Sequence, residues 1–258
     1  MLSYQHGYHA GNLADVHKHA MLAWMLDALA AKDKPLSYIE THAGRGLYDL
    51  AAPEAALTGE AARGIGRAEA WFPTDDPYAR VLAQTRRMHG PDAYPGSPLI
   101  AALALRPQDR LTLAELHPQE HEALARHLGA YGARVERRDG AAMALALTPP
   151  DPRRGVLLVD PSWEVKTDYE DVPELLGRVH RKWAVGILML WYPLLADARH
   201  APMLARLMAA FPEALRHEVR FPPAREGRGL EGSGLLVVNP PWKLDGRAAW
   251  LSDRFARL

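Results

Sequence analysis

The fold is decided by one continuous stretch, Leu36-Ser37-Tyr38-Ile39-Glu40-Thr41-His42-Ala43-Gly44-Arg45-Gly46. Its first five residues read as a short strand, and this strand runs straight into a glycine turn. Gly44 and Gly46 have no Cβ, so the backbone can bend sharply there and a ligand can approach it closely. A strand that feeds such a turn is typical of the first βα corner of a nucleotide-binding sheet. By itself the turn is a weak signal, because the third glycine of the dinucleotide fingerprint is missing.

Further strand-like runs follow this corner, at residues 111–115, 133–135, 155–159, 186–191, 217–221 and 235–238. Helix-like stretches separate the early runs, for example residues 119–128. Strands that alternate with helices indicate an α/β fold with a mostly parallel, seven-stranded sheet, whose ligand lies at the carboxyl ends of the strands. Only a glycine-rich stretch separates the last two runs, so we expect an antiparallel hairpin at the sheet edge.

The chain around this corner divides into three parts. Asn12 as an N-cap, with Asp15 in the first turn and apolar residues at helical spacing as far as Leu29, predicts an N-terminal helix. In a simple βαβ unit the acid that binds a ribose lies roughly 20 residues past the glycine turn, but Glu115 lies much farther along, which indicates an insertion. We therefore predict an arm, helix and first strand with its turn (residues 1–46), an inserted small helical subdomain (47–106) and the remainder of the sheet domain (107–258).

Composition narrows the classes of protein that the chain can belong to. The 258 residues carry 31 Lys plus Arg against 31 Asp plus Glu, and they include no cysteine. Disulfides, thiolate metal sites and cysteine nucleophiles are therefore excluded, and a reducing cytoplasm is the expected compartment. No apolar run approaches the ~20 residues that cross a bilayer, and the N-terminus lacks the pattern of a secretion signal. Zero net charge argues against nucleic-acid binding by bulk electrostatics, although arginines cluster at residues 134–138, 153–154 and 178–182.

Acidic residues end or follow three of the predicted strands. Glu115 can accept hydrogen bonds from two ribose hydroxyls, and Asp139 can accept from an amine or anchor a loop. Each of these acids, taken alone, is equally well explained as a solvated charge at a strand end. Together with the glycine turn, in this order, they indicate a nucleoside cofactor lying across adjacent strand ends.

The most informative feature is Asp160-Pro161-Ser162-Trp163, directly after a strand. An aromatic amine is a poor nucleophile, so an enzyme that methylates it must accept its hydrogens and aim its nitrogen at the donor. The Asp160 carboxylate and the Pro161 carbonyl can accept those hydrogens, and the Trp163 ring can stack on the base. This is the logic of the D/N-P-P-Y/F/W motif of amino-group methyltransferases, except that Ser162 replaces the second proline.

A second candidate, Asn239-Pro240-Pro241-Trp242, fits the written motif more closely. It follows the last predicted strand, far from the glycine turn in strand order, whereas Asp160 follows the fourth strand and is expected beside the cofactor. We therefore assign the chemistry to Asp160.

Histidines are frequent near the N-terminus, at positions 6, 9, 17, 19 and 42. Two imidazoles three residues apart can share a metal ion. No carboxylate repeats at ligand spacing beside them, so we predict no metal site and expect these side chains to cap, to bind ligand or to lie at the surface.

The chain resembles one known family along nearly its whole length. The matching residues are Met1 to His6, His9 to Asn12, Ala14 to Val16, Lys18-His19, Thr41 to Gly44 with Gly46 and Tyr48, Tyr94 to Pro98, Glu115 to Pro118, Asp139-Gly140, Lys166 to Tyr169, Trp191 to Pro193 and Asn239 to Lys243. They are similar to the bacterial family of 23S ribosomal RNA adenine-N6 methyltransferases that modifies one adenine near the peptidyl-transferase centre. The resemblance implies a Rossmann-like domain with an inserted helical subdomain, and S-adenosylmethionine as the methyl donor.

The same resemblance implies roles for individual residues. The cofactor would lie against His19, His42, Gly44, Gly46, Ser97, Glu115, Asp139, Gly140 and Asp160. Asp160, Pro161 and Trp163 would be catalytic, and Tyr4, His6 and Trp163 would contact the RNA. The implied partner is large-subunit ribosomal RNA in a deproteinised or early-assembly form, with the enzyme a cytoplasmic monomer that needs no membrane. Methylation of DNA adenine or of a protein amide, and a non-catalytic RNA-binding or cofactor-sensing role marked by Ser162, remain the alternatives.

Overall fold

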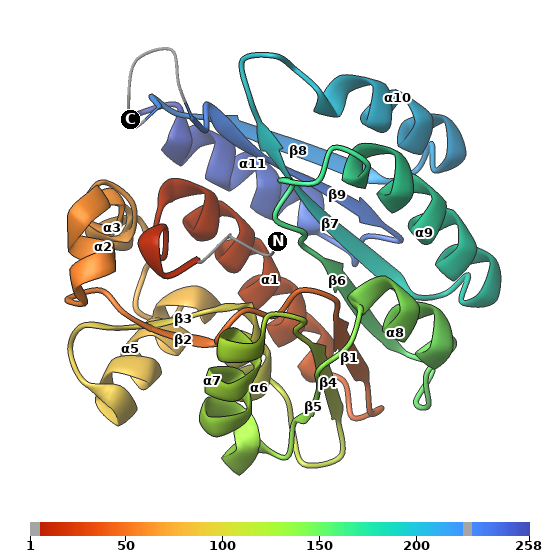
Figure 1. Ribbon diagram of the computed structural model, residues 1–258, viewed down its shortest axis with the longest axis horizontal. Coiled ribbons are helices and arrows are strands. Elements are labelled where there is room, and N and C mark those ends of the chain that lie inside the picture. The colour runs from red at the N-terminus through yellow and green to blue at the C-terminus, as the bar shows by residue number, and fades with distance from the viewer. Residues whose placement is uncertain (1–5, 224–228) are drawn as a thin grey trace.

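Seven strands form one sheet in the order β5-β4-β1-β6-β7-β9-β8 (Figure 1). The computed structural model describes residues 6–223 and 229–258. The strands are β1 (Ser37–Glu40), β4 (Arg110–Ala114), β5 (Arg134–Glu136), β6 (Gly155–Val159), β7 (Ile187–Leu194), β8 (Leu215–Arg220) and β9 (Gly232–Val238). Only β9 runs antiparallel to its neighbours, β7 and β8. The predicted Rossmann-like, mostly parallel sheet with an antiparallel hairpin at its edge is therefore confirmed.

Helices cover both faces of the sheet, because the central strands are apolar on both sides. Val156 and Leu158 of β6 pack against a core that includes α1 (Leu13–Ala30), α5 (Pro77–His89), α6 (Ser97–Ala104), α7 (Pro118–Leu128) and α11 (Leu244–Phe255). The alternate residues, Leu157 and Val159, face a second core that includes α8 (Gly140–Leu147), α9 (Asp168–Lys182) and α10 (His200–Ala210). Residues one apart on a strand point to opposite faces, so a single apolar run serves both layers.

Helix α1 begins as the sequence predicts, with Asn12 Oδ1 accepting from the backbone N–H of Asp15 at 2.9 Å. The helix packs against β9 and α6. It ends before Lys32-Asp33-Lys34-Pro35. Most of its residues are buried, including the polar ones Asp15, His17, Lys18 and His19. Polar side chains that are buried in this way must be held in hydrogen bonds or ion pairs.

Residues 47–106 contain α2 (Pro53–Thr58), α3 (Glu60–Arg63), α4 (Ile65–Ala68), α5 and α6. They also contain a small antiparallel sheet of β2 (Leu47–Asp49) and β3 (Ala93–Pro95), which the sequence did not predict because three-residue strands have no usable period. A buried ion pair, Arg247 Nη1 to Asp76 Oδ2 at 2.8 Å, ties this segment to α11. Short 3₁₀ helices occupy His6–Tyr8, Glu69–Trp71 and Gly129–Tyr131.

In the described ranges, no helix is both long enough and apolar enough to cross a membrane.

Candidate active site

A cavity of about 760 Å³ opens at the carboxyl ends of β1, β4, β5 and β6. Most of the residues that the sequence singled out line it together, namely His6, His19, His42, Gly44, Ser97, Glu115, Asp139, Gly140, Asp160, Pro161, Ser162 and Trp163. Gly46 shapes the turn without lining the cavity, and Tyr4 lies outside the described residues. Parallel strands end at the same edge of a sheet, which is why residues so far apart in sequence meet here.

The glycine turn is held in place by the acid that follows β4. Gly44 and Gly46 have φ values of 61° and 76°, which glycine adopts without strain, and a Cβ on Gly44 would lie 2.6 Å from the Tyr48 hydroxyl. Glu115 Oε2 accepts from the Gly44 N–H at 2.8 Å, and Oε1 accepts from the His117 N–H at 2.7 Å. Burial raises the pKa of Glu115, although these N–H groups act against the rise. Each carboxylate oxygen keeps a second lone pair with which to accept a ligand hydroxyl.

Asp139 and Gly140 join β5 to helix α8. The Asp139 carboxylate caps the helix by accepting from the Ala142 N–H at 2.7 Å. A Cβ on Gly140 would lie 2.0 Å from the Thr41 carbonyl oxygen, so only glycine allows α8 to approach the end of β1. Position 140 is therefore fixed by the close packing of two loops at the cavity floor.

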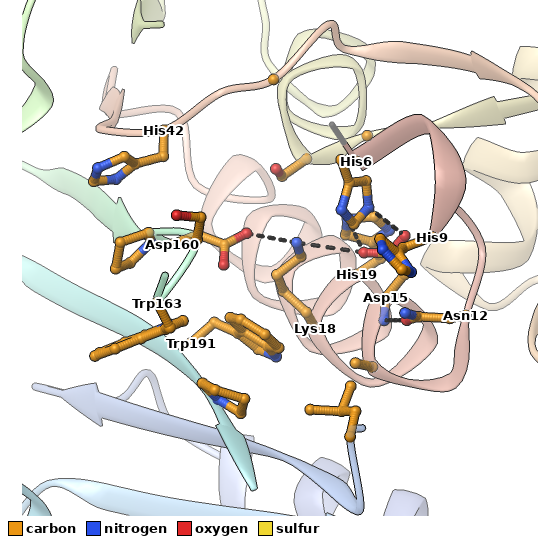
Figure 2. Close-up of a pocket in the computed structure, with 18 of the residues that line it drawn as sticks. His6, His9, Asn12, Asp15, Lys18, His19, His42, Asp160, Trp163 and Trp191 are labelled. Atoms are coloured by element: carbon orange, nitrogen blue, oxygen red, sulfur yellow. Dashed lines mark hydrogen bonds and ion pairs between the residues drawn. The ribbon is translucent and has the colours of Figure 1, made fainter. Parts of the chain in front are cut away.

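An ion pair at the centre of the cavity joins α1 to β6. Lys18 Nζ donates to Asp160 Oδ2 at 2.6 Å and lies 3.4 Å from Asp15 Oδ1 (Figure 2). Burial alone would lower the pKa of Lys18, but the two carboxylates outweigh it and raise that pKa. Sequence reasoning assigned Lys18 no role, because its partner is distant in the chain and neither residue carries a local pattern that links them.

Asp15 is the hub that connects this ion pair to the N-terminal arm. His6 Nε2 lies 2.8 Å from Asp15 Oδ2, and the Gly11 N–H donates to the same oxygen at 2.9 Å. Burial alone would raise the pKa of Asp15, but His6, His19 and Lys18 hold it well below its usual value. The arm residue His6 is thereby linked through one carboxylate to the ammonium that contacts Asp160.

His19 lines the cavity but is almost completely buried, with 1% of its surface exposed. Its Nδ1 lies 2.9 Å from the Tyr94 hydroxyl, and Tyr94 in turn lies 2.8 Å from the Tyr78 hydroxyl. Burial lowers the pKa of His19 to about 3, so the ring is neutral. His42, by contrast, is exposed at the cavity, with Nδ1 2.8 Å from the Thr41 hydroxyl.

Glu40, at the end of β1, is a second residue that the sequence did not single out. Its side chain is fully buried and accepts from Ser97 Oγ at 2.5 Å and from the Tyr38 hydroxyl at 2.9 Å. Burial raises the pKa of Glu40 to about 8, although both hydrogen bonds act in the opposite direction. Glu40 thereby holds the Ser97 hydroxyl, which lines the cavity, and joins the end of β1 to the start of α6.

The loop after β6 carries the motif. Ser162 is exposed, and Trp163 adopts φ 60°, a left-handed conformation that is unusual for a large side chain. Only 7% of Trp163 is exposed, and its ring packs 4.8 Å from Tyr169.

Asn239 ends β9 at the opposite edge of the sheet, because β9 runs antiparallel to β7. Its Nδ2 donates to the Ala184 and Gly186 carbonyls, both at 2.8 Å. The second motif match therefore fastens a loop, and the expected position of Asp160 beside the glycine turn is confirmed by the pairing of β6 with β1.

Among the described residues, the arginines that line the cavity are Arg63 and Arg67. Residues 153–154 come directly before β6 and residues 178–182 end α9, and none of them lines the cavity. Among residues 6–223 and 229–258, no cluster of three His, Cys, Asp or Glu side chains could hold a metal ion.

Comparisons with known proteins agree with the resemblance seen in the sequence. The chain is 42% identical to "Ribosomal RNA large subunit methyltransferase J" of Escherichia coli K12 over 252 residues, covering 95% of this chain and 89% of that protein. The Haemophilus influenzae protein of the same name is 38% identical over 253 residues, with the same coverage. A crystal structure of a Legionella pneumophila protein superposes with a TM-score of 0.86 at 33% identity, covering 95% of this chain and 92% of the other. Because the family model "Ribosomal RNA large subunit methyltransferase D, RlmJ" also matches residues 33–257, the chain belongs to this family of ribosomal RNA methyltransferases.

Proposed function

We propose that this protein transfers a methyl group from S-adenosylmethionine to N6 of one adenine in 23S ribosomal RNA. The observation that carries the proposal is the Asp160-Pro161 pair at the end of β6, beside the glycine turn of β1 and within one cavity. Relatives that cover nearly the whole chain bear the name of a large-subunit ribosomal RNA methyltransferase. Family membership supports the class of reaction, and the site supports the choice of an amine as the acceptor.

The cavity suits S-adenosylmethionine by size and by the chemistry of its donors and acceptors. Glu115 follows β4, where a carboxylate can accept from ribose hydroxyls. Gly44 lines the cavity, and because it has no Cβ its backbone would allow a ligand to approach closely. Ser97, His42 and Asp139 would hold the polar ends of the same ligand. When bound, S-adenosylmethionine would supply an electrophilic methyl on its sulfonium, and the carbon–sulfur bond would break as the bond from N6 to carbon formed.

Asp160 and Pro161 would direct the attacking amine. The adenine N6 hydrogens would be accepted by a carboxylate oxygen of Asp160 and by the Pro161 carbonyl, which turns the nitrogen lone pair toward the methyl carbon. As the bond forms, N6 becomes cationic, and one proton must leave it. The Asp160 carboxylate would take that proton or pass it to water.

Lys18 would hold the Asp160 carboxylate in place until the base arrives. The 2.6 Å contact occupies Oδ2, so the other oxygen is available to the amine. An ammonium whose pKa is raised cannot act as the base. Asp15, at 3.4 Å, offers the same ammonium an alternative partner when the base enters.

The RNA would reach this site as a flipped adenosine. Flipping costs a few kcal/mol and is cheapest for a base that is already unpaired, which favours deproteinised or early-assembly RNA over a mature ribosome. We propose that Tyr4 and His6 of the arm meet the RNA, that Arg63 and Arg67 of the inserted segment 47–106 face its phosphates, and that the enzyme works in the cytoplasm as a monomer. Zero net charge then predicts modest affinity that falls with salt.

Tritium transfer from labelled S-adenosylmethionine tests the proposal. The expected result is incorporation at a single adenine of deproteinised 23S RNA, found as N6-methyladenosine after digestion. DNA containing the same sequence and a protein fraction from the ribosome serve as competing substrates. Incorporation into either in place of RNA would move the assignment to that substrate, whereas tight cofactor binding without any product would identify a non-catalytic homologue.

A further inference from the structure

The catalytic cavity carries little positive charge with which to hold a polyanion. Among the described residues that line it, acidic side chains outnumber Lys and Arg, of which only Lys18, Arg63 and Arg67 are present. Lys18 already contacts Asp160 and lies near Asp15. RNA carries a negative charge on every phosphate, so the cations that meet its phosphates supply a large share of the affinity. A long RNA therefore needs cations on another surface of this protein.

Exposed cations gather at the opposite edge of the sheet, where the parallel strands begin. Arg153 lies shortly before β6, and Arg181 and Lys182 end α9, shortly before β7. Lys243 follows β9, which runs antiparallel to β7 and therefore ends at this same edge. Lys34, before β1, lies at the same edge, and all five side chains are exposed. The arginine clusters at 153–154 and 178–182 thus belong to the edge that faces away from the cavity.

Three of the loops at this edge are fastened to one another by hydrogen bonds. Asn239 Nδ2 donates to the Ala184 and Gly186 carbonyls, both at 2.8 Å. Trp183 is fully buried, and its Nε1 donates to the Arg153 carbonyl at 2.6 Å. The loop before β7 therefore joins the loop before β6 to the loop after β9, and the cations of these loops share one surface.

A tryptophan lies on the same surface. Trp242 is the most exposed of the large apolar side chains among the described residues, at 82%, and Val185 on the adjoining loop is 65% exposed. Lys243 Nζ lies 4.2 Å from the centroid of the Trp242 ring. An exposed aromatic ring beside cations is the combination on which proteins stack the bases of single-stranded nucleic acids.

The cations of this surface are also available to a ligand. Among the described residues, Arg153, Arg181 and Lys243 form no ion pair with a carboxylate. Asp151, an acid of the same edge, lies instead 3.9 Å from Arg110, measured from Oδ2 to Nη2. On a chain whose net charge is zero, unpaired cations gathered on one surface favour a polyanion as its occupant. Membership of a ribosomal RNA methyltransferase family makes that polyanion RNA.

We propose that Arg153, Arg181, Trp242 and Lys243 form a second RNA-binding surface, here called the amino-end surface. It would bind a single-stranded segment of large-subunit RNA, with phosphates against the three cations and one base stacked on Trp242. The five residues of β6 span roughly 17 Å between this surface and the cavity, so the segment is distinct from the target nucleotide. The inference rests on the proposed function for its choice of RNA, and goes beyond it by assigning a contact remote from the chemistry.

Filter binding of deproteinised 23S RNA over a series of salt concentrations tests the cations. The triple variant R153Q/R181Q/K243Q should bind RNA about 10-fold or more weakly. Its plot of log affinity against log salt should be shallower by about 2, since each phosphate contact on a single strand contributes roughly 0.7 to the slope. In methylation assays its KM for RNA should rise by the same factor, while kcat and the KM for S-adenosylmethionine stay unchanged.

A matched control separates this surface from net charge. The triple variant R87Q/R126Q/R206Q loses the same charge from exposed arginines on α5, α7 and α10, none of which lines the cavity. It should bind RNA with the affinity and salt dependence of the wild type.

Trp242→Ala tests the stacked base. It should weaken RNA binding by about 5- to 100-fold, the usual effect of losing one base-stacking ring, and leave the salt dependence unchanged. Trp242→Phe, which retains a ring, should recover most of the loss.

Equal RNA affinity and salt dependence for the wild type and R153Q/R181Q/K243Q would overturn the inference, and methylation by the wild type would leave the proposed function intact. Equal losses in the two triple variants would also overturn it, because net charge alone would then explain them. If these substitutions weaken only binding to phosphatidylglycerol vesicles, or only self-association in sedimentation, the surface belongs to a lipid or to a second copy of the chain. Absence of methylation by a wild type that still binds RNA through this surface would remove the proposed function alone. If the triple variant does not fold, as lost affinity for S-adenosylmethionine in calorimetry would reveal, the three single variants decide, and wild-type RNA affinity in all three contradicts the proposal.

Discussion

Lys18 Nζ lies 2.6 Å from Asp160 Oδ2, although 142 residues separate the two in the chain. This contact joins the N-terminal helix to the end of a central strand. It also places the positive charge of Lys18 beside the Asp160 carboxylate, which we propose as the acceptor of the hydrogens of the target amine. Both side chains are largely buried, at 7% and 13% exposed. The pair is therefore part of the packing of the fold as well as of the site.

Replacing Lys18 by Met should lower the free energy of unfolding by about 3 kcal/mol, because a buried ion pair that loses one partner leaves the other charge uncompensated. Two carboxylates, Asp15 and Asp160, would lose their shared ammonium. Urea unfolding at pH 7 measures the change. The double variant K18M/D15N removes one of the orphaned charges and should recover part of the loss; a K18M variant as stable as the wild type would contradict the argument.

Asp160→Ala should abolish measurable turnover, with a loss on the order of 10³-fold, since positioned proton acceptors contribute roughly 10²–10⁴-fold to such reactions. Asn239→Ala is the matched control, because Asn239 also precedes a proline at a strand end. It should keep its kcat but lose about 1–2 kcal/mol of stability, as two carbonyls lose their donor. The reverse outcome, with activity lost only in Asn239→Ala, would transfer the chemistry to the second motif.

Glu40 should make the protein less stable as the pH rises. Its pKa is about 8 in the folded chain against an ordinary 4.5, so the folded state binds the extra proton between these values. The stabilisation is complete below pH 4.5 and is lost as the pH passes 8, with a slope on the order of 1 kcal/mol per pH unit. Glu40→Gln mimics the neutral carboxyl and should flatten this dependence in urea unfolding at pH 5, 6.5 and 8. Parallel curves for the two proteins would show that Glu40 is ionised when folded.

His17 and His217 should act in the opposite direction. Burial depresses both pKa values, that of His217 to about 4, so the unfolded chain binds more protons once the pH falls below 6.5. The stability they contribute is present above pH 6.5 and is lost on acidification. The double variant H17L/H217L, which fills the same space with apolar side chains, should unfold at lower pH than the wild type in an acid titration followed by circular dichroism. Equal acid midpoints would mean that other groups control acid unfolding.

Much of the fold could be predicted because its signals are local. The strand before Gly44 and the glycine turn after it predict the first strand-to-turn connection of the sheet. The Asn12 cap starts α1 at the expected residue. The short strands β2 and β3 were not predicted, because three residues are too few to show the alternation of apolar and polar side chains that marks a strand. Their pairing also joins residues that lie 46 positions apart, such as Tyr48 and Tyr94. Asp160, Glu115 and Asp139 could be placed at one edge because the carboxyl ends of parallel strands coincide.

The amino-acid sequence by itself determined the α/β class, the placement of Glu115, Asp139 and Asp160 at the carboxyl ends of successive strands, and the family to which the chain belongs. Each of these depends on residues that are neighbours in the chain or on motifs that can be compared directly. Only the tertiary structure decided that Lys18 contacts Asp160, that Glu40 is buried against Ser97, and that Trp163 is buried beside Tyr169. The physical reason is that an ion pair, a desolvated carboxyl and a covered ring each depend on the groups around them, and those groups come from segments that only folding brings together.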